Sequence, residues 1–181
     1  MKIAVLLAEG FEELEAVSVI DTLRRAGIDT LIVSLAEAEV YGSHGIGMLS
    51  DKVWEEVDFS DLDGVVLPGG LPGATRLGED QRVLELIREL HKEERMIAAI
   101  CAAPVVLEKA GVIKGRNATS YPSFEESMES CSYSEDRVVT DGHIITARGP
   151  GVALEFALQL VGYLRDKEQA EELREKMLVA P

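Results

Sequence analysis

Residues 96–104 read MIAAICAAP, an apolar run that ends on Cys101. A strand that only fills a core would end on valine, leucine or isoleucine, whereas this one ends on a thiol between alanines. A nucleophile elbow needs small residues two positions before and after the nucleophile, and Ala99 and Ala103 occupy those positions. Pro104 suits the first turn of a helix, because its φ is fixed and it lacks an N–H. The stretch therefore predicts a buried strand, a sharp turn at Cys101 and a helix.

Strand and helix patterns alternate on both sides of this turn. Continuous apolar runs, typical of strands covered on both faces, predict strands at 2–8, 30–35, 64–67 and 96–100. Helical spacing of apolar residues predicts helices at 12–26, 80–94, 103–110 and 151–164, followed by a polar helix at 167–178. An Asp-Gly pair predicts a hairpin over 137–147. Residues 36–58 have no clear period and are expected to form a loop with short, antiparallel strands.

This alternation predicts one α/β domain over residues 1–181, with a mostly parallel sheet covered by helices on both faces. We expect a short strand in 115–120 and a short helix in 123–130. Ligands of such folds gather beyond the carboxyl ends of the strands, and Cys101 stands at such an end.

Charge and cysteine content exclude several classes of partner. The chain has 18 Lys and Arg against 33 Asp and Glu, a net charge of −15, and no basic stripe for nucleic acid or an anionic membrane. No apolar run approaches the roughly 20 residues of a membrane span. We interpret the amino terminus as a first strand rather than an export signal. The two cysteines, Cys101 and Cys131, lie in unlike contexts and predict no disulfide, so the expected location is the cytoplasm.

The surroundings of Cys101 predict a reactive thiol. A helix start favours the anion, so we expect its pKa to lie below that of free cysteine, whereas Cys131 has no such setting. Gly69 and Gly70 end the strand before it and leave backbone N–H groups free to hold an oxyanion. Three acids follow the first strand, Glu12, Glu13 and Glu15, and periodicity does not choose among them. An acidic first helical turn also explains them.

The remaining candidates are histidines and one arginine. His91 is expected on a solvated helix and His143 in a hairpin, both without a special role, while His44 lies in a loop that could reach a cleft. No histidine and carboxylate pair shows metal spacing, so no metal is expected. Arg148 precedes a Gly-Pro turn that opens a helix and could form an anion-facing corner.

Five motifs resemble the ThiJ/PfpI superfamily, in its DJ-one branch. They are AEGFEELEAV (8–17), VVLPGG (65–70), AAICAAPVVL (98–107), TDGHIITARGPG (140–151) and EFAL (155–158), in order along essentially the whole chain. The resemblance implies a three-layer flavodoxin-like sandwich, similar to class I glutamine amidotransferases. It also implies a homodimer and an oxidation-sensitive cysteine at the elbow.

Carried over position by position, the family's cysteine falls on Cys101 and its protonated glutamate on Glu15. Gly69, Gly70 and the backbone of Ala102 match the amides around the sulfur. Two departures from the family pattern stand out. The first is Ala102, which replaces the histidine that peptidase-like relatives place after the cysteine. The second is Tyr121, which takes the place of a histidine near the site in the human-type branch, while His44 falls where some relatives have arginine.

The resemblance implies a cytoplasmic protein of oxidative and carbonyl stress. Its cysteine would act on small α-oxoaldehydes without a cofactor, as a glyoxalase or deglycase, and would be oxidisable to sulfinate. One alternative is a non-enzymatic redox sensor or chaperone-like dimer. Another is an amidase or peptidase, which the absence of both histidines disfavours.

Overall fold

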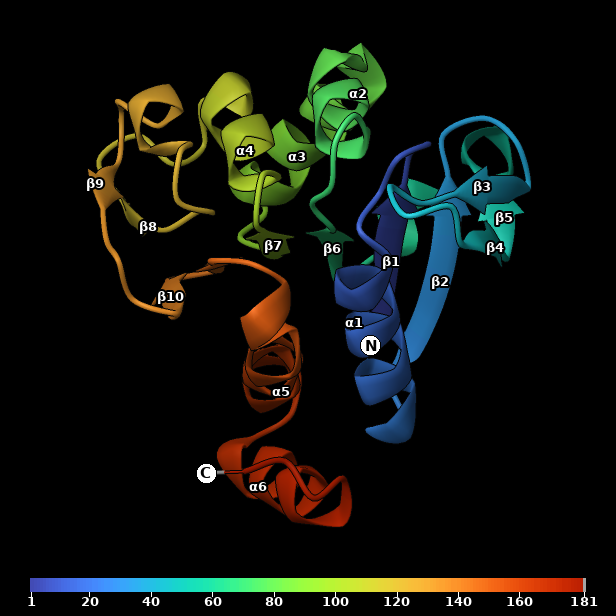
Figure 1. Ribbon diagram of the computed structural model, residues 1–181, viewed down its shortest axis with the longest axis vertical. Coiled ribbons are helices and arrows are strands. Elements are labelled where there is room, and N and C mark those ends of the chain that lie inside the picture. The colour runs from blue at the N-terminus through green and yellow to red at the C-terminus, as the bar shows by residue number, and fades with distance from the viewer. Residues whose placement is uncertain (181) are drawn as a thin grey trace.

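A seven-stranded sheet forms the centre of the protein in this computed structural model, which describes residues 1–180 (Figure 1). The strand order is β10-β11-β7-β6-β1-β2-β5. The strands are β1 (Lys2–Leu7), β2 (Asp29–Ser34), β5 (Lys52–Val53), β6 (Gly64–Leu67), β7 (Met96–Ile100), β10 (Val138–Asp141) and β11 (Ile144–Ala147). All neighbours are parallel except β10 and β11, which form the predicted antiparallel hairpin.

Helices cover both faces of this sheet (Figure 1). One face carries α1 (Glu13–Arg25), α5 (Ala153–Leu164) and α6 (Lys167–Lys176), and the other carries α2 (Gly73–Glu79), α3 (Gln81–Lys92) and α4 (Pro104–Ala110). Side chains alternate along β1, so Ile3 and Val5 join the first core and Ala4 and Leu6 the second. The predicted three-layer α/β fold with a mostly parallel sheet is confirmed.

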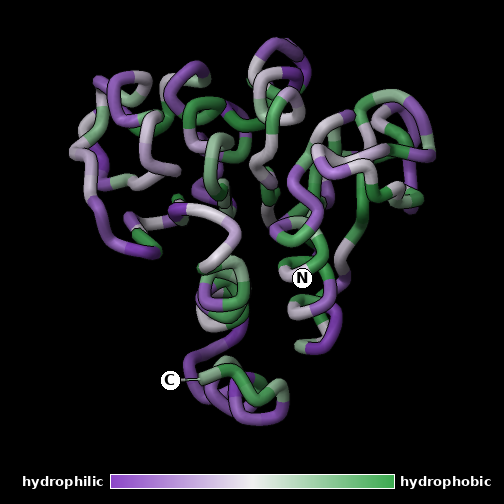
Figure 2. The backbone as a smooth tube through the Cα atoms, viewed as in Figure 1, coloured by the Kyte–Doolittle hydropathy of each residue, from purple (hydrophilic) through white to green (hydrophobic). Residues whose placement is uncertain are grey.

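Hydropathy differs between the inner and the outer elements of the fold (Figure 2). The strand β1 is completely apolar after Lys2 because helices cover both its faces. Helix α5 is also largely apolar, whereas the outer helix α6 buries only Leu173. Among residues 1–180, no helix has the length and hydropathy that crossing a membrane requires.

Several short elements differ from the prediction. Helix α2 was not predicted, because its seven residues contain two glycines and too few turns for an apolar period. The segment 123–130 forms only a 3-10 turn, η3 (Glu125–Ser127). Within 36–58, the strands β3 (Glu39–Tyr41) and β4 (Gly47–Leu49) pair antiparallel as predicted. Strand β8 (Asn117–Ala118) pairs with β9 (Ser132–Tyr133) in a separate small sheet.

The fold brings three turns together at the carboxyl ends of β1, β6 and β7. Glu12 donates its backbone N–H to the carbonyl of Gly69 at 2.9 Å, which joins the turn after β1 to the turn after β6. Gly73 donates to the carbonyl of Gly10 at 3.2 Å across the same two turns. Cys101 follows β7 directly, so the thiol lies beside both turns.

Candidate active site

Cys101 occupies a strained backbone position between β7 and α4. Its φ is 64°, in the left-handed region that costs a residue with a Cβ on the order of 1–2 kcal/mol. The strand and a neighbouring loop hold this conformation. Cys101 donates its N–H to the carbonyl of Ala147 at 2.9 Å, and its own carbonyl accepts from Tyr121 at 2.9 Å. The predicted sharp turn is therefore present, with the thiol half-buried at its tip.

Two backbone amides and one carboxyl group surround the sulfur. The amides of Gly70 and Ala102 lower the pKa of the thiol, and the side chain of Glu15 raises it, so all three groups lie close to the sulfur. The amide of Gly69 differs from the expectation, because it donates to Oε2 of Glu15 at 2.8 Å rather than to the sulfur. Gly69 thus positions the carboxyl group, and Gly70 and Ala102 are the amides that face the thiol.

Glu15 is the acid that the fold directs to the sulfur. Its side chain is fully buried, and its Oε1 has no hydrogen-bond partner. Burial raises the pKa of Glu15 to about 7, against the opposing hydrogen bond from Gly69, and the charge of Glu12 acts in the same direction as burial. A carboxyl group with this pKa accepts and releases protons near neutral pH, as a general acid or base must.

The thiol itself does not have the lowered pKa that the helix start predicted. Burial and the neighbouring Glu15 raise the pKa of Cys101 to about 12, and the amides of Gly70 and Ala102 only partly oppose this. The prediction was wrong because it considered the helix terminus alone. It omitted the desolvation of the sulfur and the repulsion between a thiolate and an ionised carboxylate.

Cys101 and Glu15 therefore titrate as a coupled pair. The charge of Glu15 raises the pKa of the thiol, and that contribution disappears when Glu15 is protonated. A thiol beside a carboxylate and a thiolate beside a carboxyl group contain the same number of protons. Both belong to the state that forms when the pair loses its first proton. With these pKa values the remaining proton lies mainly on the sulfur, and the ionised Glu15 beside it is the group that can take this proton when the sulfur attacks.

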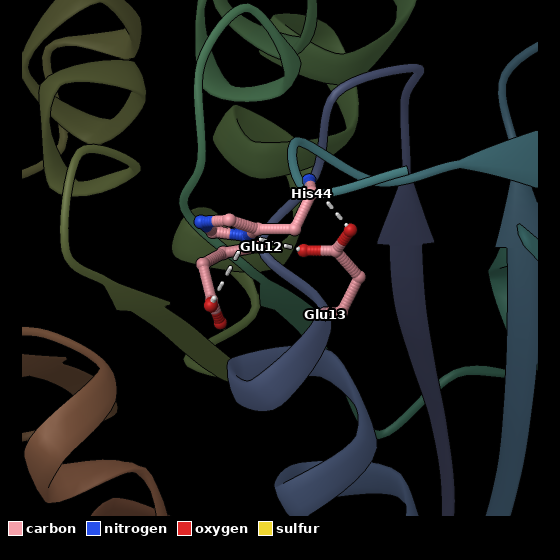
Figure 3. Close-up of side chains that lie close together, drawn as sticks. All are labelled: Glu12, Glu13 and His44. Carbon is pink, nitrogen blue, oxygen red and sulfur yellow. Dashed lines mark hydrogen bonds and ion pairs between the residues drawn. The ribbon is translucent and has the colours of Figure 1, made fainter. Parts of the chain in front are cut away.

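A second hydrogen-bonded network lies at the start of α1 (Figure 3). Glu13 is buried, and its Oε2 lies 2.9 Å from Nδ1 of His44, while its Oε1 accepts from the backbone N–H of His44 at 2.7 Å. Glu12 caps α1, with its Oε2 accepting from the N–H of Glu15 at 2.6 Å. Its Oε1 lies 4.0 Å from Nδ1 of His44. The sequence did not reveal this network, because His44 and Glu13 are joined only by tertiary structure.

The cluster of Glu12, Glu13 and His44 places three groups of metal-ligating type within 4.8 Å of one another, which the spacing in sequence did not indicate. Hydrogen bonds account for the geometry, since both oxygens of Glu13 already accept bonds. Burial acts to raise the pKa of Glu13, but the hydrogen bonds from His44 and from backbone amides outweigh it and lower that pKa. We describe the cluster as an ion-pair network.

Two other predicted site residues, Tyr121 and Arg148, differ in how they relate to Cys101. Tyr121 is joined to Cys101 through its backbone N–H, and its half-exposed ring lies against Gly149. The guanidinium of Arg148 donates to the carbonyl of Glu135 at 2.8 Å, so this contact directs it to the loop before β10 rather than to the sulfur. Cys131 donates to the carbonyl of Met128 and takes no part in the site.

Known proteins are similar to this chain over most of its length. The model of the DJ-1/PfpI family matches residues 1–162. The chain belongs to the DJ-1/PfpI family. Protein dj-1beta of Drosophila melanogaster is 44% identical over 179 residues, covering 97% of this chain and 96% of that protein. A Pyrococcus abyssi protein named as a deglycase is 32% identical over 168 residues, 91% of this chain and 100% of that one.

Solved structures of the DJ-1/PfpI family have the same fold. The crystal structure of Drosophila melanogaster DJ-1beta has a TM-score of 0.95 at 43% identity and covers 100% of both chains. A structure described as oxidized DJ-1 of Toxoplasma gondii has a TM-score of 0.93 at 36% identity and covers 99% of both. The resemblance inferred from the five sequence motifs is thereby confirmed.

A histidine pair with one buried member contradicts one expectation for this DJ-1/PfpI chain. His143 is buried rather than a plain surface residue of the hairpin, and its Nε2 lies 2.9 Å from Nδ1 of His91 on α3. Burial lowers the pKa of both rings, and for His143 the neighbouring His91 and Arg116 add to this, against Glu94 and Asp141. Sequence spacing did not indicate that the helix and the hairpin meet here.

This pair predicts acid destabilisation. Because the pKa values of both rings are lowered on folding, the pair contributes stability above the unfolded pKa of about 6.5, and that contribution is lost as the pH falls through the folded values. We expect the urea midpoint of the wild type to fall more steeply from pH 7 to pH 5 than that of His143→Leu. The raised pKa of Glu15 has the opposite effect but acts equally in both proteins. Parallel profiles would contradict the prediction.

Proposed function

We propose that the protein acts on small α-oxoaldehydes through Cys101, as a cofactor-independent glyoxalase or deglycase of oxidative and carbonyl stress. The observation that supports this most is the half-buried sulfur between two backbone amides and a carboxyl group whose pKa is about 7. An attacking sulfur, a proton acceptor and donors for a developing oxyanion are the groups that addition to an aldehyde requires. Two free cysteines suit a reducing compartment such as the cytoplasm.

The first step is addition of the sulfur to the aldehyde carbon. Glu15 takes the thiol proton as the S–C bond forms, and the electron pair of the C=O bond moves to oxygen. The N–H groups of Gly70 and Ala102 lie at the sulfur, so they are placed to stabilise charge next to it. Protonation of that oxygen completes a hemithioacetal.

The second step needs no external oxidant. A proton leaves the former aldehyde carbon, and another is added to the adjacent ketone carbon, whose oxygen becomes a hydroxyl. The first carbon is oxidised to a thioester while the second is reduced, so electrons balance within the substrate. Water then cleaves the thioester, and methylglyoxal plus water gives lactate. Glu15 is placed to return protons at each stage because it remains beside the sulfur.

One relative supports the reaction class. The Pyrococcus abyssi protein of the same family is named as a deglycase, and it aligns over nearly all of this chain. Deglycation and glyoxalase chemistry start from the same addition of a thiol to a carbonyl carbon. We place the glyoxalase reaction first because it requires only a small aldehyde and water at the half-buried sulfur.

Lactate formation from methylglyoxal tests the proposal. We expect Cys101→Ser to lose about 10³-fold or more of the rate, because it removes the nucleophile. Cys131→Ser is the matched control and should retain wild-type activity, since Cys131 makes no contact with the site. A wild-type protein that forms no more lactate than Cys101→Ser contradicts the enzyme proposal.

A redox sensor is the second candidate function. The same amides and Glu15 are placed to hold the oxygens of a sulfinate, and a structural neighbour from Toxoplasma gondii is described as oxidized. We expect mild peroxide to add two oxygen atoms to Cys101 before it modifies Cys131, as mass spectrometry of peptides would reveal. Modification of both cysteines at equal rates would exclude a dedicated sensor.

We also propose a homodimer. Leu14 on α1 and Leu154 on α5 are exposed by 57% and 39%, and they line one groove of about 610 Å³. A second copy would remove this apolar surface from water. We expect sedimentation velocity to give a dimer for the wild type and a monomer for Leu154→Glu. A wild-type monomer at micromolar concentration contradicts the proposal.

A further inference from the structure

His44 has the features of an oriented acid–base group, although the motifs around Cys101 contain no histidine. Its Nδ1 lies 2.9 Å from Oε2 of Glu13, a buried side chain. A carboxylate oxygen accepts, so Nδ1 carries the hydrogen and the other ring nitrogen, Nε2, is free to exchange a proton. The backbone N–H of His44 also donates to Glu13, at 2.7 Å, which holds the loop as well as the ring.

This histidine lies beside the turn after β1, and that turn contacts the turn after β6 that faces the sulfur. Its Nδ1 is 4.0 Å from Oε1 of Glu12, and the backbone N–H of Glu12 donates to Gly69 at 2.9 Å. A methyl group added at Gly70 would collide with that backbone nitrogen of Glu12, so the two turns are in contact. Figure 3 shows the ring extending away from Glu13 and across Glu12.

The charges around His44 favour its protonated form. The hydrogen bond to Glu13, followed by the charges of Glu13 and Glu12, raises the pKa of His44. The ring is 70% exposed, so an arriving substrate can reach it. Glu15 is buried against the sulfur and takes the thiol proton, which leaves the addition step without an acid for the carbonyl oxygen.

We propose that His44, oriented by Glu13, is the general acid that protonates the carbonyl oxygen when Cys101 adds to an aldehyde. This inference rests on the proposed function. The thiol proton moves to Glu15, the S–C bond forms, and the C=O electron pair becomes an oxygen lone pair that takes the Nε2 proton. Glu15 gains one proton and His44 loses one, so charge balances, and solvent restores His44. Glu13 is a positioning residue in this step.

Two reagents separate this role from a structural one. Addition of Cys101 to methylglyoxal needs a proton on oxygen, whereas alkylation by iodoacetamide expels iodide and needs none. We expect His44→Gln to slow adduct formation with methylglyoxal by about 100-fold, the usual contribution of a general acid, and to leave alkylation by iodoacetamide unchanged. His91→Gln, which removes an imidazole away from the site, should change neither rate.

The pH dependence of adduct formation with methylglyoxal is an independent test of the role of His44. In the wild type, the methylglyoxal rate should fall at high pH as His44 loses its proton. Glu13→Gln should move that limb to lower pH, because it removes the partner that raises the pKa of His44. His44→Gln should have no such limb.

The outcomes also separate this inference from the proposed function. If Cys101 forms the adduct at the same rate in wild type and His44→Gln, the inference is overturned and the role of Cys101 stands. If His44→Gln slows both reagents equally, His44 is structural and the inference is again overturned. If wild-type Cys101 forms no adduct, both proposals fail.

Discussion

Replacing Gly69 with alanine is expected to remove most of the reactivity of Cys101. The added methyl group would lie 2.6 Å from Cβ of Cys101, 2.8 Å from Oε2 of Glu15 and 3.0 Å from the carbonyl oxygen of Ile100. All three atoms are held by the fold, so the sulfur or the carboxyl group must move. Because a displacement of about 1 Å can reduce a rate about 100-fold, we expect at least that loss in alkylation of Cys101 at pH 7.

Gly151→Ala is the matched control for this substitution. A methyl group at Gly151 meets no atom within 4 Å, so we expect wild-type reactivity and stability. Circular dichroism and urea unfolding establish whether Gly69→Ala is folded, since overpacking costs about 1–3 kcal/mol. A folded Gly69→Ala protein that reacts at the wild-type rate would show that the contact between Glu15 and Cys101 is unnecessary.

Glu15→Gln is expected to slow the reaction of Cys101 at neutral pH by about 100-fold, within the range for loss of a general base. Glutamine keeps the shape of the side chain and accepts the hydrogen bond from Gly69, but it cannot hold the thiol proton. Iodoacetamide alkylation followed by mass spectrometry measures the rate. Glu172→Gln is the control, because Glu172 is exposed on α6 and pairs with Lys176, away from the sulfur. Equal rates for wild type and Glu15→Gln would contradict a role in proton transfer.

The main elements of the fold were predictable because burial leaves a strong signal in the sequence. The strands β1, β2, β6 and β7 are continuous apolar runs, and α3 carries apolar residues at helical spacing. Gly111, with φ of 77°, ends α4 as expected of a C-terminal glycine. Helix α2 was missed, and the parallel pairing of the short strand β5 with β2 was not predicted, because elements of this length are formed by tertiary contacts rather than by their own periodicity.

The candidate site was predictable only in part. The elbow at Cys101 follows from local sequence, because small residues and a proline permit the turn. The choice of Glu15 came from family resemblance, since Glu12 and Glu13 fit the helix equally well. The link between Glu13 and His44, the pair of His91 and His143, and the raised pKa of the thiol all depend on contacts between distant segments. Local sequence patterns do not predict contacts of this kind.

The pH dependence of Cys101 alkylation tests most directly whether the thiol and Glu15 share a proton. We predict that the rate rises with a midpoint near pH 7, the pKa of Glu15, and then remains level, because the second proton leaves only near the thiol value of about 12. In Glu15→Gln the midpoint near pH 7 should disappear, and the reaction should require alkaline pH. A wild-type rate that rises only above the pKa of free cysteine, about 8.5, would contradict this account.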